Sequence, residues 1–269
     1  LTAGGGESGK TAPVPAEIGR LSKEGSELLS QRRYPAAAQV FLRGAELASA
    51  YEDHRRQGLF LNAAAGSYFS THRYRDAEAA YRSAVGSAQA AGDRELEAVA
   101  RLNLASLYIS LWEPDAGEAE LQLAESLLPS SSEHRSRFLA LRLYLSARRG
   151  DSEGARAWGR AAADAADRLG QTALLAQIWD KLGDVALRDR RLDEAEEYLT
   201  ASFRLRRLGK LPQINSSYYS LARLRLAQDR VRDAEALVAA ARSRPAGGPG
   251  GGSGVEHPRQ HIGARRPGE

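Results

Sequence analysis

One pair of positions recurs along this chain at an almost constant spacing. Each pair is a small residue followed four positions later by a second residue that is usually larger and apolar, and successive pairs lie 40, 40, 38, 40 and 39 residues apart. Four residues is about one helical turn, so each pair lies on one face of a helix. A regular step over six units predicts stacked repeats rather than one globular core. The pairs are Ala37/Phe41, Ala77/Tyr81, Gly117/Leu121, Ala155/Gly159, Ala195/Leu199 and Ala234/Val238.

The best-preserved unit lies at 179–202. Its first apolar stripe has the three- and four-residue spacing of an α-helix and comprises Trp179, Leu182, Gly183 and Ala186. A polar break at 188–191 precedes a second stripe, Leu192, Ala195, Leu199 and Ser202. The unit is therefore predicted to be two amphipathic helices joined by a tight turn. Small residues within the stripes, Gly183 and Ala195, predict a close approach of the two helix backbones.

This unit resembles a tetratricopeptide repeat (TPR). The family's Trp-x2-Leu-Gly-x2-Tyr opening is matched by Trp179, Leu182 and Gly183, with Ala186 in place of tyrosine. The step exceeds the usual ~34 residues and is similar to the longer TPR variety of bacterial signalling regulators and adaptor proteins. The resemblance implies an all-α fold, a right-handed α-α superhelix of about six helix-turn-helix repeats whose first helices line the concave side. We expect the extra residues to lengthen mostly the second helices.

Composition divides the chain into three parts. Residues 1–15 and 244–269 are rich in glycine and proline and are predicted to be a disordered segment and a disordered linker or tail. The solenoid is predicted at 16–243. Its repeats are expected at about 17–53, 54–92, 93–130, 131–170, 171–209 and 210–243. The chain starts at Leu1 and contains no methionine, so we expect it to be part of a longer protein.

Glycines and short polar residues mark the helix ends between repeats. Second helices are expected to stop at Gly92, Gly170 and Gly209, because glycine accepts the left-handed conformation that terminates a helix. The following helices are expected to be capped by Asp93 and Thr172.

No motif in the sequence predicts catalysis, a cofactor or a metal. Residues 4–11 fit the P-loop pattern, but only three residues precede them, and Pro13 and Pro15 follow where a helix should begin. His257 and His261 have the spacing of a zinc-binding pair, but Pro258 lies between them. The chain has no cysteine. We therefore expect a protein that is not an enzyme and binds no cofactor or metal.

The charge pattern leaves a nucleic-acid alternative open. The chain holds 38 lysines and arginines against 34 acids, nearly all of the bases being arginine, and has a net charge of +4. Such a chain could be the TPR part of a transcription regulator that binds nucleic acid through arginine-rich surfaces. We favour arginines spread over solvated helix faces, because no long basic block occurs within the helices. No run approaches the ~18 apolar residues of a membrane span, and we expect a cytoplasmic protein without a membrane partner.

The TPR resemblance also implies where a ligand would bind. Matched to the family's inner-face positions, the candidate peptide-binding residues are Asn62, Asn103, Tyr144, Asp180, Lys181, Asp184, Tyr219 and Arg223. A carboxamide carries both donor and acceptor, so Asn62 and Asn103 could hold the backbone of an extended peptide. The alternative is that these asparagines form a hydrogen bond from helix to helix across neighbouring repeats. Ser22 and Ser26 stand where the carboxylate clamp of chaperone-binding TPRs needs lysine and asparagine, which argues against a clamp of that kind.

These observations predict a protein–protein interaction scaffold that binds a peptide or partner protein in a concave groove. By analogy with TPR arrays that precede CHAT-type protease domains or accompany LuxR-type regulators, we expect it to be the regulatory or sensing part of a larger bacterial protein.

Overall fold

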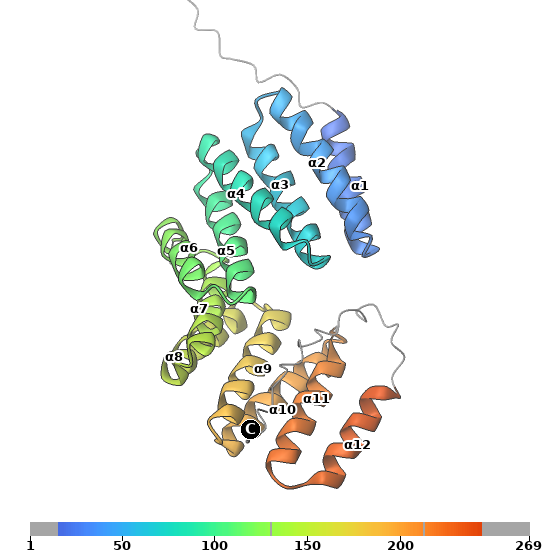
Figure 1. Cartoon of the computed structure of the whole chain (residues 1–269), viewed down its shortest axis with the longest axis vertical. Coiled ribbons are helices and arrows are strands. Elements are labelled where there is room, and N and C mark those ends of the chain that lie inside the picture. The colour runs from blue at the N-terminus through green and yellow to red at the C-terminus, as the bar shows by residue number, and fades with distance from the viewer. Residues whose placement is uncertain (1–15, 130, 212, 244–269) are drawn as a thin grey trace, which may run out of the picture.

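The computed structural model describes residues 16–129, 131–211 and 213–243, and this part of the chain holds twelve α-helices and no strand (Figure 1). The helices form six consecutive hairpins, so the predicted all-α solenoid of about six helix-turn-helix repeats is confirmed. The predictions for 1–15 and 244–269, including the P-loop-like stretch and the histidine pair, lie outside the described residues. The helices are α1 (Ala16–Ser30), α2 (Tyr34–Ala50), α3 (His54–Ser70), α4 (Tyr74–Ala90), α5 (Arg94–Ser110), α6 (Pro114–Leu127), α7 (Arg135–Arg149), α8 (Ser152–Arg168), α9 (Thr172–Arg188), α10 (Leu192–Leu208), α11 (Ile214–Ala227) and α12 (Val231–Arg242).

Most helices are joined by the same short turn, within repeats and between them. Its central residue has a positive φ, as in Glu52 (56°), His72 (60°) and Gly92 (64°). This conformation lets the backbone N–H groups after a helix reach back to its last carbonyls and end it. Aspartates then start several of the next helices, because the carboxylates of Asp53 and Asp93 accept hydrogen bonds from backbone N–H groups of the first turn.

Two of the five predicted helix-end residues are placed differently. Gly92 and Gly170 have the expected left-handed conformation, and Asp93 is a cap. Gly209 has a φ of −76°, and the left-handed residue is Lys210. Thr172 is the first residue of α9, not its cap, since its hydroxyl donates to the Gly170 carbonyl.

The small residues of the repeats lie where paired helices approach closely. A Cβ atom added to Gly183 would lie 2.5 Å from Leu199 Cδ2 on the facing helix, and Ala195 is completely buried. The prediction that mostly the second helices are lengthened is wrong. In the fifth repeat α9 and α10 have 17 residues each, so the longer period is shared between both helices.

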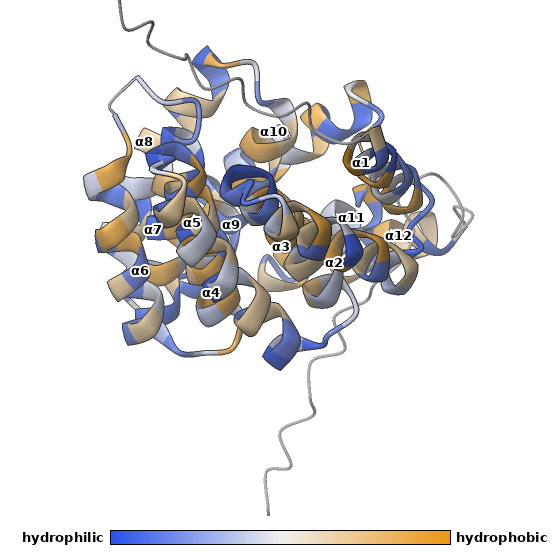
Figure 2. Cartoon of the chain, turned by 90° about the horizontal axis from the view of Figure 1, so that it is seen from above, coloured by the Kyte–Doolittle hydropathy of each residue, from blue (hydrophilic) through white to orange (hydrophobic). Residues whose placement is uncertain are grey.

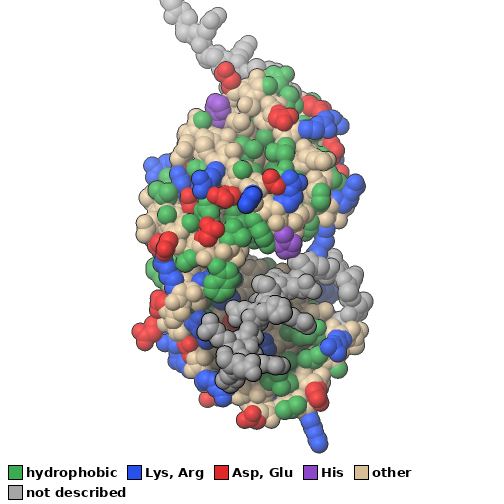
Figure 3. Space-filling view, viewed as in Figure 1, with side chains coloured by type: hydrophobic (Ala, Val, Ile, Leu, Met, Phe, Trp, Pro, Cys, Tyr) green, Lys and Arg blue, Asp and Glu red, His purple; other side chains and the backbone are tan. Residues whose placement is uncertain are grey.

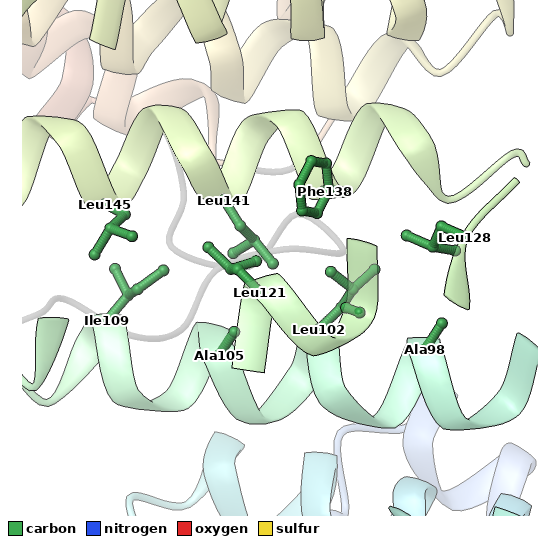
Figure 4. Close-up of a cluster of buried hydrophobic side chains, with 10 residues drawn as sticks. Ala98, Leu102, Ala105, Ile109, Leu121, Leu128, Phe138, Leu141 and Leu145 are labelled. Carbon is green, nitrogen blue, oxygen red and sulfur yellow. The ribbon is translucent and has the colours of Figure 1, made fainter. Parts of the chain in front are cut away.

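Neighbouring hairpins share clusters of buried apolar side chains. Figure 4 shows the contact between the third and fourth repeats, where Leu121 of α6 lies between α5 and α7, near Leu102 and Leu141. Phe138 and Leu102 are fully buried there, as is Leu121. Each hairpin therefore covers the apolar stripe that its neighbour cannot bury alone.

The first helices form a layer of their own. Contacts join α3 to α5, α5 to α7, α7 to α9 and α9 to α11, in addition to those between consecutive helices. The array also curves: in Figures 1 and 2 the terminal helices α2 and α12 lie on one side of the molecule, and α6 and α8 lie on the opposite side. The surface of this layer, called here the first-helix face, carries the predicted binding residues.

Candidate binding surface on the first helices

The structure brings seven of the eight predicted residues into two groups on the first-helix face. Asn62 and Asn103 meet on α3 and α5. Five others, Tyr144, Asp180, Lys181, Asp184 and Arg223, come from α7, α9 and α11. Tyr219 lies on α11 with 46% of its surface exposed. Their contacts with a peptide stay a prediction.

The first group is a hydrogen-bonded ladder across three repeats. Asn103 Nδ2 donates to Asn62 Oδ1 at 2.6 Å, and Arg137 Nη2 of α7 donates to Asn103 Oδ1. The hydrogen bond between neighbouring repeats that the sequence left open is therefore present. Because each amide oxygen already accepts a hydrogen bond, the asparagines are less free to accept one from a peptide backbone than the sequence suggested.

Arg137 is the member of this ladder that sequence reasoning did not select. Its guanidinium is largely buried, and among the described residues no carboxylate forms an ion pair with it. Burial lowers the pKa of Arg137, while the nearby Tyr81 hydroxyl acts in the opposite direction. The only signal in the sequence was its position, because it occupies an inner-face site one repeat after Asn103.

The second group is a set of charged contacts that ties three repeats together. Lys181 Nζ lies 5.6 Å from the centre of the Tyr144 ring and 3.6 Å from Asp184 Oδ2. Arg223 Nη1 donates to Asp184 Oδ1 at 2.9 Å, which links α11 to α9. Burial raises the pKa of Tyr144 to about 12, so its hydroxyl is neutral and can donate a hydrogen bond.

Asp180 is held by a second arginine that the sequence did not reveal. Arg206 Nη2 lies 2.5 Å from Asp180 Oδ2, and the Arg206 side chain is only 4% exposed. Its Nη1 also donates to the hydroxyls of Ser216 and Ser217, at 2.9 and 2.7 Å. Burial raises the pKa of Asp180, and the Arg206 charge opposes that shift. The ion pair joins α9 to α10, and the hydrogen bonds to the two serines extend the link to α11.

Apolar side chains accompany the polar groups. Leu59 of α3 is 43% exposed, comparable with Tyr219 of α11 near the other end of the array. Trp158 and Trp179 pack against the core between the fourth and fifth repeats.

Within the described ranges no group of three or more His, Cys, Asp or Glu side chains is arranged to hold a metal ion. None of the helices described has the length and apolar character needed to cross a bilayer.

Comparison with known proteins places the chain by its fold. No protein-family model matches the sequence, and a search of curated proteins finds no significant match. Among solved structures, the chain is similar to RapI in its apo form, with a TM-score of 0.70 and 14% identity over 84% of this chain and 83% of RapI. It is also similar to BtubC (BKLC) from P. vanneervenii, with a TM-score of 0.57 and 18% identity over 86% of this chain and 90% of BtubC. These similarities show a helical-repeat superhelix.

Proposed function

We propose that this protein is an interaction scaffold that binds an extended segment of a partner protein along the first-helix face. The observation that carries the proposal is the continuous layer of first helices, which presents Leu59 and Tyr219 with the two polar groups between them. Exposed aromatic and aliphatic side chains combined with hydrogen-bonding polar groups are typical of protein interfaces. Its role as a regulatory or sensing part of a larger bacterial protein belongs to the same proposal and rests on the TPR resemblance.

We also propose that the chain acts by binding and not by catalysis. The polar side chains of the first-helix face are engaged in a ladder and in ion pairs that hold repeats in register. Groups held in this way present a fixed pattern of donors and charges to a ligand, which suits recognition.

The described residues give no structural observation in favour of the nucleic-acid alternative. Arginines such as Arg101, Arg142 and Arg225 form ion pairs with carboxylates on the same or neighbouring helices. Where Figure 3 shows the described surface uncovered, acidic side chains lie among the basic ones. A phosphate backbone is bound by clustered, unpaired positive charge.

The proposal is tested by selecting peptides from a random display library on the full chain and measuring their affinity for matched variants. Leu59→Ala on α3 is compared with Leu123→Ala on α6, because both leucines are similarly exposed, at 43% and 46%. Tyr219→Ala is compared with Tyr51→Ala, a turn tyrosine with 55% exposure. Loss of an interface anchor typically costs about 1–2 kcal/mol, or roughly tenfold in affinity.

The expected result is a roughly tenfold loss for the two first-helix variants and no change for the two controls. Equal losses in both sets, or peptides whose binding depends on Leu123 or Tyr51, would place the binding surface elsewhere and contradict the proposal.

A further inference from the structure

Arg137 fixes the direction of the hydrogen bonds in the asparagine ladder. A guanidinium can only donate hydrogen bonds, so the Asn103 atom facing Arg137 must be its oxygen. The Asn103 amide nitrogen then faces Asn62 and donates to the Asn62 oxygen at 2.6 Å. The orientation of both amides therefore follows from the chemistry of Arg137.

This direction leaves the ladder with an excess of donors. Both amide oxygens are already used as acceptors, whereas among the described residues the Asn62 Nδ2 group has no acceptor. The Arg137 guanidinium has five N–H donors. Among the described residues it forms one hydrogen bond, to Asn103. A ligand that satisfies this group must bring acceptors.

The charge of Arg137 is also uncompensated. Arg101 and Arg206, whose side chains are 12% and 4% exposed, each pair with a carboxylate of a neighbouring helix, at 2.9 and 2.5 Å. Arg142, 14% exposed, pairs with Glu118. Within the described ranges Arg137 has no such partner, although burial makes its charge costly. A buried cation with free donors favours an anionic ligand with two acceptor oxygens, which is a carboxylate in a peptide.

We propose that Arg137, together with Asn103 and Asn62, forms a carboxylate-binding site that selects an acidic side chain in the partner segment. The site refines the proposed function by assigning one position of the bound segment to Glu or Asp. It differs from a grip on the peptide backbone, because the ladder offers donors and a positive charge and each of its amide oxygens already accepts a hydrogen bond within the protein.

The test uses three small probes with the full chain, observed by NMR through the side-chain amide signals of Asn62 and Asn103. N-acetylglutamate N-methylamide carries only the side-chain carboxylate. N-acetylglutamine carries only a terminal carboxylate, and N-acetylglutamine N-methylamide carries none. Each probe is titrated into the wild type, into Arg137→Gln and into Arg75→Gln, a control in which an exposed arginine of α4 is removed.

The first probe is expected to bind at least about tenfold more tightly than the uncharged probe, in the wild type and in Arg75→Gln, and to lose this preference in Arg137→Gln. Equal shifts with charged and uncharged probes, or equal losses in both variants, would overturn the proposal. Tighter binding of N-acetylglutamine would assign the site to a chain terminus and would also overturn it. Failure here leaves the proposed scaffold function to its own test, because that test compares Leu59→Ala and Tyr219→Ala with their controls and does not use Arg137→Gln.

Thermal unfolding separates a binding role from a structural one. A site kept for a ligand holds an uncompensated charge at the expense of stability, so Arg137→Gln is expected to leave the melting temperature unchanged or raise it. If Arg137→Gln lowers the melting temperature and binding of the first probe is retained, the arginine is a structural link between α5 and α7 and the proposal is wrong.

Discussion

Two glycines that look alike in sequence should respond oppositely to the same substitution. Gly86 and Gly183 both lie inside helices, on α4 and α9. A Cβ atom at Gly86 would meet nothing within 4 Å, whereas at Gly183 it would lie 2.5 Å from Leu199 Cδ2 and 2.6 Å from Leu199 Cγ. Leu199 cannot avoid the second contact by rotating its terminal methyl groups alone, so the helices α9 and α10 or the whole leucine must move.

The magnitudes follow from these distances. Replacing glycine by alanine in a helix interior gains about 1 kcal/mol, and Gly86→Ala is expected to show that gain. Overpacking at Gly183 costs about 1–3 kcal/mol, so Gly183→Ala is expected to be neutral or destabilising by up to ~2 kcal/mol. The two variants should then differ by about 1–3 kcal/mol, and each kcal/mol corresponds to roughly 2–4 °C in Tm for a domain of this size.

Urea unfolding followed by circular dichroism and by tryptophan fluorescence measures the difference. Trp179 reports on the affected repeat, since it lies on α9 and stacks on Tyr198 of α10 with ring centres 5.4 Å apart. Leu199→Ala completes a double-mutant cycle with Gly183→Ala. The loss of unfolding free energy caused by Leu199→Ala should be about 1–3 kcal/mol smaller in the Gly183→Ala background, because the shortened side chain removes the clash. If Gly183→Ala stabilises as much as Gly86→Ala, the close contact between α9 and α10 is wrong.

Three other substitutions test the turns, the core and the link between repeats. Glu52→Gly should stabilise by up to about 1 kcal/mol because φ is 56° there, whereas Glu46→Gly in the middle of α2 should cost about 1 kcal/mol; the opposite order in thermal melts would contradict the turn geometry. Ala195→Arg should cost about 3 kcal/mol or more, because it forces a charged side chain into a fully buried site, and unchanged urea unfolding would reject the register. A hydrogen bond from Arg225, a second one from Gln228 and the Arg225 charge lower the pKa of Glu196 to about 2. The pair of Glu196 and Arg225 therefore stabilises the fold above the ordinary carboxyl pKa of 4.5, and this stabilisation is lost as the pH falls toward 2. Glu196→Gln should therefore flatten the stability profile in that window, and an unchanged profile would show that the pair contributes nothing.

The repeat architecture could be predicted from the sequence because it depends on close contacts between helices, where packing restricts the size of the residue. Where two helices approach closely, only a small residue fits opposite a large one, and Gly183 facing Leu199 is such a place. The same constraint recurs in each hairpin, so it appears as a period. The turns were harder to read because glycine is not required at their left-handed position, which Glu52 and His72 also occupy.

The polar contacts of the first-helix face could not be predicted in the same way. Arg137 reaches Asn103 from the next repeat, and Arg206 reaches Asp180 from the second helix of the same repeat. A long flexible side chain can pair with any of several groups, and the sequence spacing does not choose among them. For Asn103 the sequence left two interpretations open, a peptide contact or a bond between repeats, and only the coordinates show the bond to Asn62.

The claim that a partner segment lies along the first-helix face is tested most directly by hydrogen exchange with a bound peptide. The highest-affinity peptide from the display selection is added to the full chain, and amide exchange is compared with and without it. The account predicts slower exchange in α3, α5, α7, α9 and α11, with α4, α6 and α8 unchanged. Protection confined to these second helices or to the turns would contradict it.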